Sequence, residues 1–326
     1  MFILSISSTT DLCKCIASTV FLHTFYHEGK FTFKKVLYLY ASYTTLVPMH
    51  EELLDYFQKQ RQHLNHYLAL CFETPDDEVV HELRVSIKRI RAIFLFTEQL
   101  AGNENFDADR HYKPLRKLFK MAGKIRDVQV QQKLVADYAN TLNSTFNVYL
   151  EHLDKLEKRS ISLFFKDIEQ GKTPHNLASI SHIIENTMSP FLKEDIKTRA
   201  LQILENQCDE LRLKLVDIPN NKQLHQMRII IKQMRYILGV IRKSDPSATG
   251  FPISLASLTE AEVLLGKWHD RIVGIALLND FRKKKKKQHE PETENYNILA
   301  SILEVEQRIL RAKIRKSLGK SLSDKE

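Results

Sequence analysis

Glycine and proline are scarce in this chain of 326 residues, which contains only nine of each, about half of what average usage would supply. Because these residues mark most turns, their scarcity predicts long elements with few connections and favours helices. Apolar residues make up 43% of the sequence, which excludes a globally disordered chain. The length is sufficient for one large or two medium domains.

Cysteine is rare as well, and no apolar run is long enough to cross a membrane. The spacing of the four cysteines fits neither a zinc site nor a disulfide framework; they are Cys13, Cys15, Cys71 and Cys208. This pattern favours a reducing compartment, and we therefore expect a cytoplasmic protein with no membrane partner. We expect no cofactor, and the sequence leaves the oligomeric state open.

Acidic residues are outnumbered by basic ones. The chain carries 49 Lys and Arg against 40 Asp and Glu, which gives a net charge of +9. Such a balance concerns partners rather than fold, and it favours an anionic partner such as a nucleic acid or a polyphosphate.

The first 48 residues differ from the rest, because their many aromatic and hydroxyl residues show no sustained helical or strand period. The apolar start Met1–Leu4 has no preceding cation, so it does not fit a secretory signal. Met49 follows Pro48 and opens a clean helical pattern. One interpretation is that translation starts at Met49, and we expect residues 1–48 to contribute nothing to the fold.

The helical period dominates from Met49 onward and predicts an all-α protein. We expect helices near residues 49–72, 77–100, 109–140, 144–169, 175–187, 190–216, 221–243, 254–286 and 292–318. Asp76 or Asp77 is a candidate cap for the second of these, and Asn220 or Asn221 for the seventh.

An internal repeat is the most informative feature of the sequence. The segment Val80–Arg91 aligns with Leu224–Arg235, so that His, Arg, Lys and Arg recur 144 residues apart. Ala122–Asp127 aligns with Leu265–Asp270 at an offset of 143. The two offsets predict a duplicated four-helix unit and hence two pseudo-symmetric four-helix bundles. The expected parts are a first repeat over 49–170, a connector over 171–189, a second repeat over 190–320 and a tail over 321–326.

The repeated segment carries a stripe of cations beside its apolar face. His81, Arg84, Lys88 and Arg91 fall within an arc of roughly 80° at helical spacing. The second copy presents the same types in the same order, as His225, Arg228, Lys232 and Arg235. Like charges at this spacing repel, so the faces are predicted to bind an anion; the plainer alternative is a solvated helix face.

The next helix extends the first stripe with Lys113, Arg116 and Lys120, and Arg126 follows on the same side of the site. In the second copy, uncharged residues, Thr259 and Val263, stand where Arg116 and Lys120 would map. The two halves are therefore expected to bind unequally.

Two glycines and two aspartates also recur in this helix. Gly123 and Gly266 lie in mid-helix, where glycine is costly, which predicts close approach of another helix or of a ligand. Asp127 and Asp270 are expected to orient neighbouring Arg or His side chains, or else to form ordinary salt bridges between helices.

With these residues in view, the sequence resembles the CHAD domain family, an α-helical family named for its histidine, over roughly 49–320. The resemblance rests on the His81–Arg91 segment, its copy from His225 to Arg235, and Gly123–Asp127. It implies two four-helix bundles related by a pseudo-twofold axis around a basic cavity that binds inorganic polyphosphate. It also implies a location at polyphosphate granules within the cytoplasm.

The predicted function is therefore non-catalytic binding of polyphosphate in a basic groove. The predicted binding residues are His81, Arg84, Lys88, Arg91, Arg116, Lys120, Arg126, His225, Arg228, Lys232 and Arg235, supported by Lys113, Asp127 and Asp270.

Two other functions stay open. A nucleic-acid backbone binder suits the charge, although stripes without interleaved aromatic residues offer no stacking for bases. A metal-dependent phosphohydrolase would use His269 with Asp270, but a metal site needs further ligands that no pattern supplies. A separate basic run, Arg282–Lys287, is expected to add only non-specific affinity.

Overall fold

The structure is a computed structural model that describes residues 49–169, 177–191, 193–217, 219–244, 250–285 and 293–323. Within these ranges the regular structure is entirely α-helical, which confirms the predicted fold class. The helices are α3 (Met49–Glu73), α4 (Asp77–Ala101), α5 (Ala108–Leu142), α6 (Asn147–Glu169), α7 (Ala178–Met188), α8 (Lys193–Leu215), α9 (Asn221–Ser244), α10 (Leu255–Lys285) and α11 (Thr293–Ser323).

Most helix ends agree with the predicted ones to within about three residues, and side-chain caps explain two of the starts. The Asp76 carboxylate accepts a hydrogen bond from the backbone N–H of Val79 at 2.9 Å and caps α4. At α9, Asn220 accepts from the Gln223 N–H at 3.0 Å, while the Gln223 side chain accepts from the Asn220 N–H at 2.8 Å. This reciprocal pair is a capping box, so Asp76 and Asn220 are the caps among the predicted alternatives.

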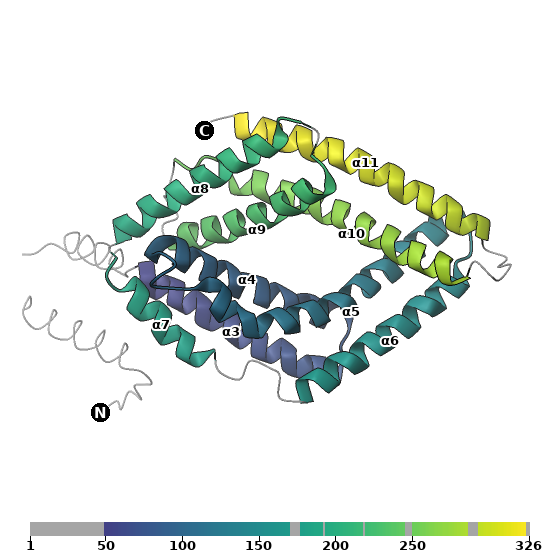
Figure 1. The fold of residues 1–326 in the computed structure, drawn as a ribbon, viewed down its shortest axis with the longest axis horizontal. Coiled ribbons are helices and arrows are strands. Elements are labelled where there is room, and N and C mark those ends of the chain that lie inside the picture. Colours follow the sequence, from purple (N-terminus) through teal and green to yellow (C-terminus); the bar gives the residue numbers. More distant parts are fainter. Residues whose placement is uncertain are drawn as a thin grey trace, which may run out of the picture. The chain divides into compact units, whose positions relative to one another are not determined.

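Consecutive helices pack side by side in two runs, α3 to α6 and α8 to α11, and α7 lies against α3 and α4 (Figure 1). The two runs also meet each other. Helix α4 packs beside α9, and α5 packs beside α10. These are the helices that carry the repeated sequence segments, so the packing brings together residues about 140 positions apart in the chain.

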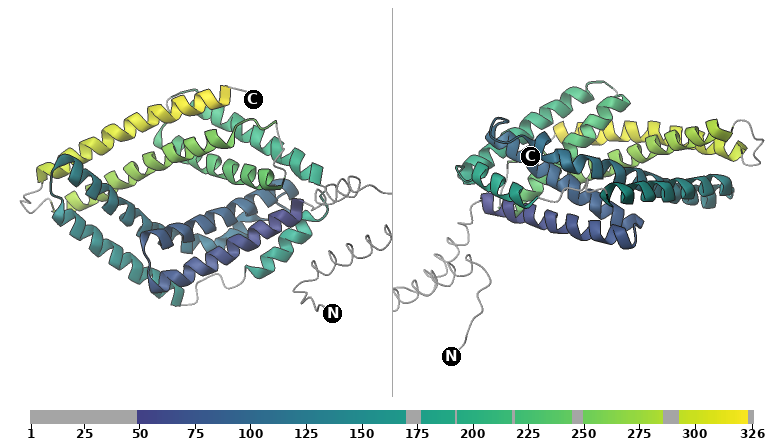
Figure 2. Two further views of the ribbon diagram at one scale, coloured as in Figure 1. Left: turned by 180° about the vertical axis from the view of Figure 1, so that it is seen from behind. Right: turned by 60° about the horizontal axis from the view of Figure 1, so that its bottom comes forward.

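Two clusters of buried side chains hold the helices together. The larger cluster draws on α3 to α11. The smaller one lies where the ends of the α5–α6 and α10–α11 pairs meet (Figure 2). Its aromatic centre consists of Tyr149, Phe281 and Tyr296. The Tyr149 and Phe281 rings are 4.9 Å apart between centroids, and Phe281 meets Tyr296 edge-on at 5.2 Å. Offset and edge-on pairs of this kind are favourable arrangements for aromatic rings.

Both clusters combine side chains from the two predicted repeats, and Pro48–Glu326 forms one compact unit. The origin of the two runs by duplication stays a prediction. Residues 1–48 of the predicted N-terminal segment, most of the connector before α7 and residues 286–287 of the basic run lie outside the described residues. None of the described helices has the length and apolar character needed to span a membrane.

Candidate functional site

The packing of α4 beside α9 places the two predicted cationic stripes against each other. Each helix buries its apolar face, with Leu83 and Ile87 on α4 and Leu224 and Ile231 on α9 fully buried. The neighbouring faces bring four cations together, which we call the central cluster: Arg84, Lys88, Arg228 and Lys232. All four are largely removed from solvent.

Three members of the central cluster lack a directly bound carboxylate. Within the described ranges, Arg84, Lys88 and Arg228 form no ion pair, and Asp127 and Asp270 act on the two arginines only at longer range. Arg84 donates to the Phe119 carbonyl at 2.9 Å and lies over the Phe119 ring, 4.4 Å from its centroid. The Nε of Arg228 is buried without a hydrogen-bond acceptor in the described part of the chain. Leaving a buried donor without an acceptor costs about 1–3 kcal/mol.

The crowding of cations changes the protonation of the cluster. Burial, followed by the charges of Lys232, Arg84 and Arg228, lowers the pKa of Lys88 to about 6. His269 on α10 faces the same cations, and burial together with Arg228 lowers its pKa to about 4. Burial raises the pKa of Asp127, although Arg84 and Arg228 oppose that shift. Lys88 and His269 therefore carry little charge near neutral pH.

The α9 side of the cluster is partly neutralised by an acid that the sequence analysis did not identify. The Glu262 carboxylate on α10 accepts from Lys232 at 2.5 Å and also pairs with Arg235. Although burial alone would raise it, the pKa of Glu262 is lowered by these cations, Lys232 first. At the repeat offset of 143 residues, Glu262 aligns with Phe119. The two halves therefore differ at this position, where the first half has the aromatic ring of Phe119 and the second has the carboxylate of Glu262.

The remaining predicted arginines of the first half lie around Tyr112 and at the start of α4. Arg91 and Arg116 both lie over the Tyr112 ring, at 4.8 and 5.8 Å from its centroid. Arg116 also pairs with Asp109 at 2.9 Å, whereas the Nε of Arg91 is buried without an acceptor in the described part. Arg126 forms an ion pair with Asp77 and donates to the Asp77 carbonyl, so it anchors α5 to the first turn of α4.

The two predicted histidines and the two predicted lysines of α5 are more exposed than the central cluster. The His81 side chain is 41% exposed and lies beside Glu82, within electrostatic reach of Lys88 and Lys232. His225 is exposed, and its ring lies 6.2 Å from that of His269. Two further lysines project into solvent from α5: Lys113 and Lys120.

The two mid-helix glycines have different surroundings. A Cβ on Gly123 would overlap the guanidinium of Arg84, which confirms the predicted close approach at this position. At Gly266 an added Cβ would meet no atom of the described residues within 4 Å, so no helix approaches closely there, and close approach of a ligand stays a prediction. Asp270, beside His269, lies within electrostatic reach of Arg228, Arg271 and Arg126. No group of three His, Cys, Asp or Glu side chains in the described ranges is arranged to hold a metal ion.

The comparisons with known proteins agree with this architecture. The sequence profile of the CHAD domain family matches residues 55–279. The chain belongs to the CHAD domain family. Among solved structures, the CHAD domain of the plant Ricinus communis is 17% identical, with a TM-score of 0.61, and the match covers 83% of this chain and 92% of that one.

A second CHAD-like fold is that of PptA from Streptomyces chartreusis, which is 15% identical with a TM-score of 0.58. That match covers 85% of this chain and all of PptA. At these identities the two structures establish the shared fold and nothing finer. No curated protein matches the sequence.

Because the pKa of Lys88 is low, we predict that this residue lowers the stability of the folded CHAD protein by an amount that depends on pH. Between about pH 6 and the ordinary lysine pKa, the unfolded chain holds one more proton on Lys88 than the folded chain, so this residue makes stability rise with pH. Lys88→Met removes this titrating group and, with it, the free-energy cost of depriving the lysine of its proton on folding. The variant should therefore be more stable than the parent at pH 6.5, and its advantage should shrink towards pH 9.

Urea denaturation of both proteins at several pH values measures this difference. Lys120→Met, which removes an exposed lysine from α5, is the matched control and should show no comparable trend. An advantage of Lys88→Met that is the same at pH 6.5 and pH 9 would show that Lys88 is charged in the folded protein throughout.

Proposed function

We propose that this protein binds inorganic polyphosphate through the central cluster and does not catalyse its hydrolysis. The observation that carries the proposal is the burial of Arg84, Lys88 and Arg228 together, without a carboxylate in direct contact. A protein tolerates such an arrangement at a large cost in desolvation and repulsion, and a bound polyanion would offset that cost. A cytoplasmic location at polyphosphate granules is part of the same proposal.

The two kinds of cation in the cluster suit a chain of phosphates. The planar guanidinium of an arginine makes two hydrogen bonds to one phosphate, whereas a lysine supplies a compact point charge. Arg84 and Arg228 would hold phosphates in fixed orientations, and Lys88 would gain its proton as the anion enters. Lys232 and Arg235 share Glu262 and would contribute less. We infer a groove that continues from Arg84 past Arg91 to Arg116.

The aromatic residues beside the cluster favour polyphosphate over nucleic acid. Tyr112 and Phe119 are the rings nearest to the stripe on α4, and arginines lie over both of them. A ring covered by a guanidinium is not available to stack on a base. Neither of these rings is therefore free to stack on a base, which favours an inorganic chain of phosphates as the ligand.

Competition binding tests the ligand class. Fluorescently labelled long-chain polyphosphate should bind the full chain with an affinity that falls steeply with salt, because bound cations displace condensed counterions. Unlabelled polyphosphate should displace it at a much lower phosphate concentration than single-stranded RNA does. Equal displacement by the two polymers would favour the nucleic-acid alternative.

A double substitution tests the site. Arg84→Gln with Arg228→Gln should weaken polyphosphate binding by roughly two to four orders of magnitude, about 3–6 kcal/mol, since each charge-assisted contact contributes about 1.5–3 kcal/mol. The matched control, Lys283→Gln with Lys284→Gln, removes two exposed charges from the basic run and should cost roughly tenfold or less. Melting curves check that both variants fold. Unchanged binding in the arginine variant, with loss in the lysine variant, would place the site in the basic run.

The non-catalytic part of the proposal has its own test. Purified protein incubated with polyphosphate or nucleotides, with and without Mg²⁺ or Mn²⁺, should release no inorganic phosphate above the uncatalysed background. His269→Ala is the informative variant, because His269 with Asp270 is the pair that a phosphohydrolase would use. Metal-dependent release that disappears in His269→Ala would overturn the proposal in favour of an enzyme.

A further inference from the structure

The C-terminal half of α11 is strongly basic and carries no acidic residue. Six cations lie between Glu306 and the helix end: Arg308, Arg311, Lys313, Arg315, Lys316 and Lys320. The opposite face, with Ile314 and Leu318, is buried in the core, so the cations are gathered on the outer side. The family match ends at residue 279, before α11 begins.

These cations pair directly with no carboxylate in the part of the chain that the structure describes; Arg311 donates to the Asn221 side chain at 2.6 Å, and Arg315 to the Val216 carbonyl at 3.4 Å. The helix dipole favours cations only within the last turn, where Lys320 is the basic residue. The dipole therefore accounts for one of the six charges, and the other five repel one another on the same helix.

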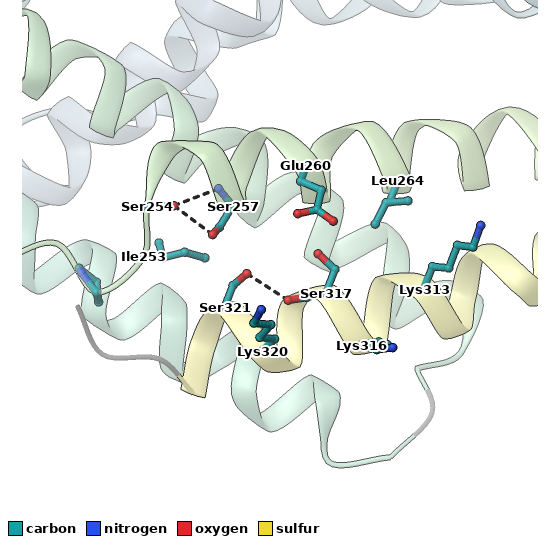
Figure 3. Close-up of a pocket in the computed structure, with 11 residues that line it drawn as sticks. Ile253, Ser254, Ser257, Glu260, Leu264, Lys313, Lys316, Ser317, Lys320 and Ser321 are labelled. Carbon is teal, nitrogen blue, oxygen red and sulfur yellow. Dashed lines mark hydrogen bonds between the residues drawn. The ribbon is translucent and has the colours of Figure 1, made fainter.

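A cavity of about 490 Å³ opens between this part of α11 and the beginning of α10. Three lysines line its α11 side, Lys313, Lys316 and Lys320, together with the hydroxyl groups of two serines of α11 and two of the α10 start. Figure 3 shows Glu260 and Leu264 on α10 facing Ser317 on α11 across the cavity. Glu260 is the one acid in this lining, so the charge of the lining residues is positive.

A second cavity lies on another side of the basic half of α11. This open cavity is lined by residues of α11 alone: Arg308, Arg311 and Arg315, with Lys316 and Lys320 shared with the first. The Nε of Arg311 is buried and has no acceptor in the described part of the chain. The first cavity falls in the size range of small-ligand sites, about 300–1,000 Å³.

We propose that the cavity between α10 and α11 is a second anion site, separate from the central cluster, which binds a short stretch of an inorganic phosphate chain. The phosphate class rests on the proposed function. Three lysines at this spacing supply point charges to successive phosphates, and serine hydroxyls donate hydrogen bonds to phosphate oxygens. The second cavity, with its arginines, would hold the continuation of the same chain along α11.

Tripolyphosphate is a suitable probe, because its three phosphates match three lysines and it is too short to join distant sites. Isothermal titration of the full chain should detect two bound equivalents. The pocket variant, Lys313→Gln with Lys316→Gln and Lys320→Gln, should bind one equivalent and keep the affinity of the central cluster. The variant with Arg84→Gln and Arg228→Gln should also bind one equivalent, which the pocket substitutions then remove.

The matched control is Lys155→Gln with Lys283→Gln and Lys284→Gln, which removes three exposed lysines elsewhere and should leave two equivalents. A pocket variant that still binds two equivalents would overturn this inference and leave the proposed function standing. Unchanged binding in the arginine variant would instead overturn the proposed function, while loss of one equivalent in the pocket variant would still support the pocket. If the pocket variant keeps its tripolyphosphate isotherm but no longer binds phosphatidylserine vesicles, the lysines serve lipid headgroups and the inference is wrong.

Discussion

The packing of α4 against α9 is the constraint on which the rest of this structure depends. Both helices are anchored by apolar side chains that are completely buried, such as Leu83 and Ile87 on α4 and Leu224 and Ile231 on α9, and each contributes about 1.5–3 kcal/mol to folding. The same contact forces Arg84, Lys88, Arg228 and Lys232 into a shared, largely dry environment. The burial of apolar side chains throughout the surrounding core thus fixes the positions of cations that would otherwise separate.

Acidic residues on the neighbouring helices reduce the repulsion among these cations but do not cancel it. Asp127 on α5 and Asp270 on α10 act on the arginines from a distance, while Glu262 directly pairs with Lys232. Where Glu262 stands in the second half, the first half has Phe119, over which Arg84 lies. A guanidinium stacked on a ring keeps its positive charge uncompensated, whereas a cation paired with a carboxylate has its charge offset and a donor occupied. The half with the aromatic residue therefore keeps more capacity for an anion than the half with the acid.

Periodicity and turn chemistry were enough to predict the helices and the two stripes, because both depend on residues close in sequence. The repeat also indicated which helices would correspond. The sequence could not predict which side chains pair between different helices, because those pairs depend on how the helices pack. Asp77 binds Arg126 from another helix, and Glu262 meets Lys232 across 30 residues. Aligned residues of the same type also have different neighbours in the two halves. Gly123 lies against the guanidinium of Arg84, whereas Gly266 has no side chain of the described residues close to it. His269 was considered only as a metal ligand, since its place among cations depends on how α9 and α10 pack.

The depressed pKa values of Lys88 and His269 mean that the charge of the central cluster is not a fixed property of the sequence. An empty cluster sheds protons, and an approaching polyanion reverses the balance that expelled them. If the proposed polyanion binds there, occupancy and proton uptake become a single equilibrium, in which acidification favours the bound state and alkalinity the free one. Such a protein would take up protons as it binds its ligand and release them as the ligand leaves.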